Sequence, residues 1–171
     1  MMRGSIRFAV RATAFLAAFA TLQLTWQGLR GTVVERVIVQ HGIVRPAAWL
    51  VNSLTPAVNV RAGDHSLQAA GGGLNILNGC EGIEALFLLG AAFLVAPAGL
   101  RARWLGMLVG TALLFALNQA RILTLFYAYR ADKSVFALLH GTVMPLVTVL
   151  LVCAYFHLWL SGGKRRAAPS V

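Results

Sequence analysis

Charged residues are scarce in this chain, and acidic ones are scarcer than basic ones. Only 12% of the 171 residues are charged, with five Asp and Glu against 15 Lys and Arg, whereas 58% are hydrophobic. The mean hydropathy of +0.74 lies far above that of a soluble globular domain. The composition therefore argues against a soluble domain and predicts a membrane protein.

Cysteine is also rare, and the two cysteines, Cys80 and Cys153, are not expected to form a disulfide. Cys153 lies 13 residues beyond His140, which is about 20 Å along a helix axis. A disulfide needs Cα atoms within about 7 Å, so we expect no bridge between Cys80 and Cys153 and assign Cys153 to packing. No spacing of His, Cys and carboxylates predicts a metal site. The triplet Gly71–Gly73 lacks the Lys and Ser/Thr of a phosphate loop and is interpreted as a hinge. No cofactor is implied.

Long apolar runs are the main feature of the chain. Three of them exceed or approach the roughly 20 residues that cross a bilayer, and a fourth is shorter. We predict an all-α fold: a polytopic membrane helical bundle, a single domain over residues 1–171. Its four transmembrane helices are expected at about residues 8–27, 80–98, 104–129 and 135–160. The helix at 80–98 needs the residues before its apolar run in order to span.

The positions of the basic residues predict the orientation of these helices. Lys and Arg cluster near residues 3–11, 101–103 and 164–166, where cytoplasmic loops carry them. This places both termini inside, an outer segment at 28–79 and a basic cytoplasmic tail at 161–171, in the cytoplasmic (inner) membrane. The net charge of +10 then reflects orientation and contact with membrane lipids, not nucleic acid.

We expect the first helix to be retained, because its apolar run is long for a signal peptide. Trp26 suits an interfacial anchor.

The outer segment divides into two parts. Residues 32–54 mix apolar and charged positions and are expected to form helix lying in the interface, with breaks at Pro46 and Pro56. Residues 58–79 are rich in glycine and roughly alternate in polarity, which favours a short hairpin or an irregular lid.

Three ionisable residues are predicted to meet near the outer face of the bilayer. Cys80 opens the second predicted helix, where free backbone amides and the helix dipole favour a thiolate. Arg121 and His140 lie at similar depths in the third and fourth helices. Ionisable groups in hydrocarbon are costly and usually mark function. A thiol, an imidazole and a fixed cation are the groups that a cysteine acyl-transfer site needs, with Arg121 acting electrostatically and His140 as acid and base.

Each of these residues also has a plainer explanation. Cys80 could be a small apolar residue at a helix end, Arg121 a snorkelling side chain, and His140 a hydrogen-bonding partner inside the bundle. Pro145 leaves the Gly141 carbonyl without its helical donor, so the backbone near His140 is locally open.

Two further polar residues are candidates for supporting the site or binding substrate. Glu84 lies one turn after Cys80 and is expected to pair with Arg121 or to orient His140. Asn118 lies one turn before Arg121 and suits a hydrogen bond that positions the guanidinium or a substrate. For both residues, simple packing within the bundle remains open.

The chain resembles the exosortase/archaeosortase family of membrane cysteine transpeptidases, in its compact form. The resemblance rests on three short elements over about residues 75–160, in the family's order. They are NGCEGIEAL around Cys80, NQARI with Asn118 and Arg121, and LLHG with His140. One departure is the Glu81-Gly82 that follows the cysteine, where the family often has Ser-Gly.

This resemblance implies an enzyme, a cysteine protease or transpeptidase with Cys80 as nucleophile and Arg121 and His140 completing the site. The implied substrates are secreted proteins with a C-terminal sorting signal made of a short motif, a transmembrane helix and a basic tail. The active site would face the extracytoplasmic side. Two alternatives stay open: a non-enzymatic scaffold for envelope export, and an acyltransferase that uses Cys80 on a lipid donor.

Overall fold

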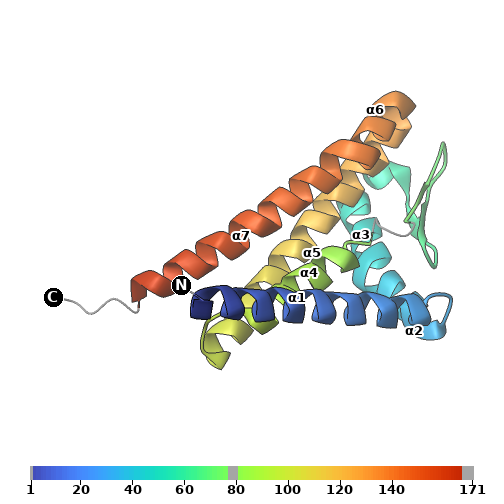
Figure 1. Cartoon of the computed structure of the whole chain (residues 1–171). Coiled ribbons are helices and arrows are strands. Elements are labelled where there is room, and N and C mark those ends of the chain that lie inside the picture. Colours follow the sequence, from blue (N-terminus) through green and yellow to red (C-terminus); the bar gives the residue numbers. More distant parts are fainter. Residues whose placement is uncertain (1, 77–80, 167–171) are drawn as a thin grey trace.

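The computed structural model describes residues 2–76 and 81–166, and it is built almost entirely of helices (Figure 1). Cys80 lies outside the described residues. The elements in chain order are the helices α1 (Met2–Leu29), α2 (Val33–Val39), η1 (Gln40–Val44), α3 (Arg45–Leu54) and η2 (Pro56–Val58), the strands β1 (Arg61–Ala62), β2 (Ser66–Gln68) and β3 (Leu74–Asn75), and the helices α4 (Ile83–Val95), α5 (Leu100–Ala131), α6 (Lys133–Leu138), η3 (Leu139–Val143) and α7 (Met144–Arg166).

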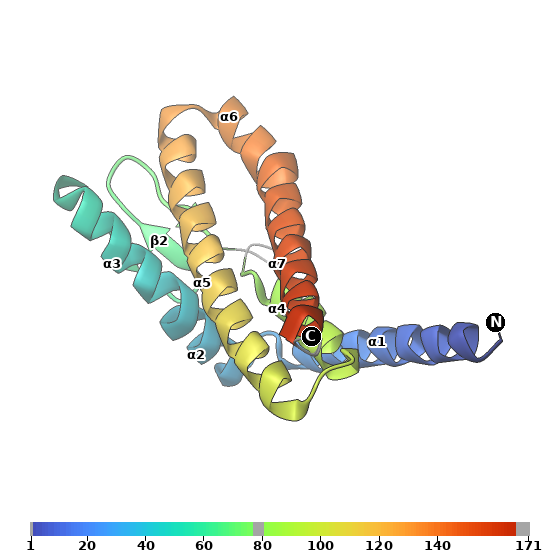
Figure 2. The ribbon, with the colours of Figure 1, turned by 90° about the vertical axis from the view of Figure 1, so that its left-hand side faces the viewer.

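Three helical stretches are long and apolar enough to cross a membrane, which indicates a membrane protein. They are Ser5–Leu29, Leu100–Ala131 and Lys133–Gly162. One third of the most apolar window of α5 is buried in the protein, against 0% and 6% for the other two. Helix α5 is therefore the central helix, and α1 and α7 present most of their surface outward (Figure 2).

The helices and the sheet are segregated along the molecule. In Figure 1 the start of α1 and the end of α7 lie at one end, and the sheet with α2 and α3 lies at the other. Helix α1 packs on α4, and α4 packs in turn on α5 and α7. The short outer elements gather around the far half of α5 through α3 and β3.

Two hydrophobic clusters hold these parts together. The larger one joins α1, α2, α3, the sheet, α4 and α5 around Val51, Leu67 and Phe126, which are almost completely buried. The smaller one joins α4, α5 and α7 around Leu89 and Phe93. Because the larger cluster lies at the sheet end, that half of the molecule is the better packed one.

Two glycines on one face of α5 allow its neighbours to approach closely. A Cβ on Gly106 would lie 2.5 Å from Phe93, and one on Gly110 would lie 2.6 Å from Leu89 and 2.8 Å from Tyr155. This is the small-xxx-small spacing with which membrane helices pack closely. The Tyr155 hydroxyl also donates a hydrogen bond to the Gly106 carbonyl.

The first part of the outer segment is helical, as predicted, but its breaks differ. Helices α2 and α3 run on through the π-helical turn η1, and Pro46 sits in the first turn of α3 instead of ending a helix. Proline is tolerated there because the first turn has no intrahelical partner for its missing N–H. The helix does end before Pro56, as expected.

The second part is a small antiparallel sheet. Its order is β1-β2-β3, with Ala62 opposite Leu67 and Leu67 opposite Leu74. The prediction of a hairpin is therefore correct but incomplete, because a third strand adds to it.

Helix α4 is shorter than the helix predicted at about residues 80–98. The helix begins at Ile83 and not at residue 80, because Gly82 precedes it in a left-handed conformation with φ of 75°. It ends at Val95 and is thus 13 residues long.

Trp26 is 4% exposed and packs edge-on against Phe87 of α4, so it is a core residue and not an interfacial anchor.

Candidate functional site

Helix α5 carries three buried polar side chains within about one turn, those of Asn118, Gln119 and Arg121. Asn118 is 9% exposed and Arg121 is 7% exposed. The side-chain amide of Asn118 donates a 3.0 Å hydrogen bond to the main-chain carbonyl of Glu81. Asn118 thus binds the residue that directly follows Cys80 in the chain.

Gly82 makes this close approach possible. Its φ of +75° is one that side-chain-bearing residues rarely adopt, and a Cβ there would lie 2.9 Å from Cγ and Oδ1 of Asn118. The glycine lets the chain turn sharply into α4 directly against α5. The Glu81-Gly82 pair therefore has a structural role at the start of α4.

His140 lies in an irregular turn, as its position before Pro145 predicts. It belongs to the π-helical turn η3, in which the N–H of Met144 donates to the Leu139 carbonyl five residues earlier. The wider turn accommodates the proline, whose ring nitrogen cannot donate. Such turns recur at functional sites.

The His140 ring is held by an aromatic row that begins on α5. It stacks on Phe136 with centroids 5.3 Å apart and an interplanar angle of 13°. Phe136 in turn meets Tyr129 edge-on at 5.3 Å. The imidazole is therefore oriented by contacts that lead back to the helix carrying Arg121.

Arg121 and His140 lie at similar distances from the turn that joins their helices. Arg121 is ten residues before Ala131, the end of α5, and His140 is seven residues after Lys133, the start of α6. The three-residue difference corresponds to about 4.5 Å along the axes, less than one turn. The equal depth inferred from the sequence thus agrees with the observed helix bounds.

Glu84, expected beside Arg121 or His140, forms an ion pair with Arg30. The distance between Arg30 Nη2 and Glu84 Oε1 is 3.7 Å, and both side chains are about one third exposed. Arg30 closes α1, so this pair ties α1 to α4. Exposed pairs of this kind contribute little stability by themselves.

A buried acidic group that the sequence did not predict lies around Glu35 and Glu81. Glu35 is 6% exposed; its carboxylate accepts from the Gly31 N–H at 3.1 Å and lies 3.0 Å from Nε2 of His65. Glu81 is 3% exposed, and its Oε2 has no hydrogen-bond partner among the residues that the structure describes. The one available signal was that Glu81 sits beside Cys80 in a chain with few acidic residues.

Burial raises the pKa of Glu81 above its ordinary value. The nearby carboxylates of Glu84 and Glu35 raise this pKa further, whereas Arg30 and the Trp26 indole partly oppose the shift.

The glycine triplet is a fixed turn and not a hinge. The Arg130 guanidinium donates to the carbonyls of Ala70 and Gly72 at 2.8 and 3.0 Å. A Cβ on Gly73 would collide with the main-chain oxygen of Leu67. The turn before β3 is therefore attached to the C-terminal end of α5.

Cys153, which the sequence assigned to packing, is an exposed free thiol on α7, so it does not serve core packing. Among the described residues, no three His, Cys, Asp or Glu side chains could together hold a metal ion.

Searches found no matching family model, curated protein or solved structure.

Proposed function

We propose that this protein is a membrane cysteine protease or transpeptidase of the exosortase kind, with Cys80, Arg121 and His140 as its catalytic residues. The observation that carries the proposal is the Asn118–Glu81 hydrogen bond. It attaches Glu81, the residue that follows Cys80 in the chain, to Asn118, which lies one helical turn before the buried Arg121 on α5. The aromatic row from Tyr129 of α5 through Phe136 to His140 supports the same grouping.

The proposed first step is acyl transfer to the thiol. His140 accepts the Cys80 proton, and the thiolate sulfur attacks the carbonyl carbon of the scissile peptide bond. Negative charge then develops on the carbonyl oxygen, where the Arg121 guanidinium stabilises it. As the C–N bond breaks, His140 returns the proton to the leaving amine, and the substrate remains as a thioester on Cys80.

The second step resolves the thioester. An incoming amine, or water, attacks the thioester carbonyl while His140 accepts a proton from it. The Cys80 sulfur then leaves and is protonated again, so the enzyme is regenerated. An arginine suits this site because it stays charged throughout, whereas histidine can carry the proton between the two steps.

The proposed substrates are secreted proteins with a C-terminal sorting signal that contains a transmembrane helix. Helices α1 and α7 expose long apolar surfaces to their surroundings, where lipids and a substrate helix would lie. The site is proposed to face the extracytoplasmic side of the inner membrane.

The proposed topology has four membrane segments with both termini inside. Two observations support it: the start of α1 and the end of α7 lie at the end opposite the sheet (Figure 1), and α4 returns the chain to the start of α5. At 13 residues, α4 is about 20 Å long, shorter than the hydrocarbon core.

A membrane-impermeant maleimide tests the topology in a chain without its two cysteines. Gln68→Cys should be labelled in intact cells, and Gly162→Cys only after permeabilisation; the reverse pattern contradicts the proposal.

The catalytic proposal is tested by processing of a co-encoded protein that ends in a short motif, an apolar helix and basic residues. Cys80→Ala and Cys80→Ser should abolish its cleavage while the enzyme still accumulates in the membrane. Cys153→Ala, the matched control for an exposed thiol, should cleave at the normal rate. Full processing by Cys80→Ala would instead favour a scaffold. A lipid-derived acyl group on Cys80 would favour an acyltransferase.

A further inference from the structure

Strand β3 has a free edge within the part of the chain that the structure describes. It pairs with β2 alone, at the end of the sheet order β1-β2-β3. The Ile76 N–H donates to the His65 carbonyl at 2.8 Å, and the register places Asn75 opposite Ser66. In an antiparallel ladder, hydrogen-bonded and non-bonded pairs alternate. Asn75 therefore turns its main-chain N–H and carbonyl away from β2, toward the open edge.

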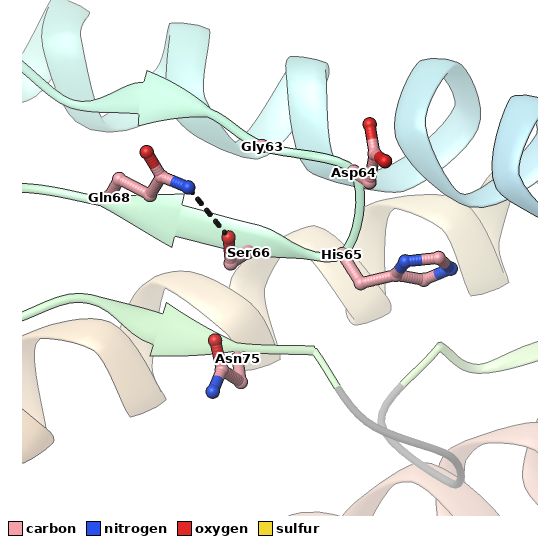
Figure 3. Close-up of a pocket in the computed structure, with 6 residues that line it drawn as sticks. All are labelled: Gly63, Asp64, His65, Ser66, Gln68 and Asn75. Carbon is pink, nitrogen blue, oxygen red and sulfur yellow. Dashed lines mark hydrogen bonds between the residues drawn. The ribbon is translucent and has the colours of Figure 1, made fainter.

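The two faces of the sheet differ in chemistry. Leu74 and Ile76 are 8% and 1% exposed and face the core, whereas the Asn75 side chain is exposed on the opposite face. On that face lies a polar hollow of about 500 Å³ (Figure 3). Its lining residues are Gly63, Asp64, His65, Ser66, Gln68 and Asn75.

The charged groups of this hollow already have partners, and its neutral ones are available. Asp64 pairs with Arg36 at 3.6 Å, and His65 lies against Glu35. The Gln68 amide makes a long hydrogen bond of 3.3 Å to the Ser66 hydroxyl, as Figure 3 shows. The amide of Asn75 and that of Gln68 can therefore donate to an oxygen acceptor.

The open edge lies close to the candidate site along the chain. Asn75 precedes Cys80 by five residues, so their Cα atoms are at most about 18 Å apart. Strand β3 contacts α5, the helix that carries Arg121, and the turn before β3 is bound by Arg130. The edge is therefore held by the same helix as the proposed catalytic arginine.

We propose that β3 is the recognition edge for substrate: the motif before the scissile bond binds as an extended strand beside Asn75. This inference rests on the proposed function. The motif's main chain would exchange hydrogen bonds with the N–H and carbonyl of Asn75, which is the general mode of strand addition. One of its side chains, carrying an oxygen acceptor, would enter the hollow beside Gln68. Main-chain bonds give affinity, and the hollow gives specificity.

A proline substitution tests this directly. Asn75→Pro removes the outward N–H but none of the ladder bonds to β2, and proline is tolerated at such edge positions. Ala62→Pro is the matched control, because Ala62 also lies at a non-bonded position, on the outer edge of β1. We expect Asn75→Pro to slow processing of the co-encoded sorting-signal protein at least tenfold, and Ala62→Pro to leave it within twofold of wild type. Equal rates in the two variants would overturn the proposal.

A crosslinking measurement covers the case in which Asn75→Pro fails to accumulate. In a Cys80→Ala chain, a photo-crosslinking residue replacing Asn75 should capture the substrate, and the same residue replacing Ala62 should not. No capture at position 75 rejects the recognition edge. If Cys80→Ala itself still processes substrate, the proposed function fails. If Cys80→Ala is inactive and Asn75→Pro is normal, only the recognition edge fails.

Discussion

The amide of Asn118 is hydrogen-bonded to the main-chain carbonyl of Glu81 at 3.0 Å, in a buried position between α5 and the start of α4. These two residues are 37 positions apart, yet each adjoins a motif of the candidate site. Their hydrogen bond sets where the chain leaves the outer segment and enters α4. The contact ties the glycine-containing turn before α4 to the middle of α5.

Asn118→Ala should uncouple this turn from α5. The variant leaves the Glu81 carbonyl buried without a donor, which costs about 1–3 kcal/mol of unfolding free energy. We expect processing to fall more than tenfold with normal membrane insertion. The control is Thr124→Ala on the same helix, whose hydroxyl bonds only the Ala120 carbonyl at the surface. Equal activity in both variants would show that the contact is not needed.

Gly82→Ala should be harmful for two separate reasons. The left-handed conformation costs an L-residue about 1–2 kcal/mol, and the new methyl would lie 2.9 Å from Asn118. A lower thermal unfolding temperature in detergent is expected, together with slower processing. Gly28→Ala is the comparison, since nothing lies within 4 Å of its Cβ position. An unchanged unfolding temperature in Gly82→Ala would refute the geometry described for this turn.

Gly110→Ala should loosen the packing of α4 and α7 on α5. Its methyl would overlap Leu89 and Tyr155, and overpacking of this kind costs about 1–3 kcal/mol. Gly90→Ala should be close to neutral, because the nearest atom is the flexible end of Met107 at 3.5 Å. Thermal unfolding of the two variants side by side measures the difference, and a similar loss in both would contradict this packing.

The raised pKa of Glu81 predicts a stability difference that depends on pH. The fold favours the protonated carboxyl, so wild type loses stability relative to Glu81→Gln as pH rises above the ordinary value of 4.5 and through the raised folded value. The variant's advantage in unfolding temperature should therefore be absent near pH 4 and grow toward neutral pH. Asp64→Asn, at an exposed surface pair, serves as the control. A constant advantage at all pH values would argue against burial of an ionisable Glu81.

The helices could be predicted from the sequence because apolar runs, proline and basic flanks are local signals. The stretch from Trp104 to Tyr129 is contained in α5, and η3 precedes Pro145 as expected. The partners of polar side chains could not be predicted in the same way. Glu84 pairs with Arg30, and Asn118 pairs with Glu81. Both contacts depend on how the long segment at 28–79 folds back over α5, and no local sequence pattern specifies that path.

Glycine and tryptophan show the same limit at single positions. The triplet at 71–73 suggests flexibility by composition, but Arg130 lies 60 residues from Ala70 in sequence and fixes the turn. Trp26 has the position of an interfacial residue, yet Phe87 of another helix covers it. Depth along a helix follows from counting residues, whereas the side on which a residue faces depends on tertiary contacts.

The most direct test of the central claim is the mass of the Cys80 peptide from enzyme quenched during turnover of the sorting-signal substrate. The account predicts that this peptide carries the substrate chain as a hydroxylamine-sensitive thioester. The Cys153 peptide of the same sample should remain unmodified. An adduct on any other residue, or continued cleavage by Cys80→Ala with no adduct at position 80, would contradict it.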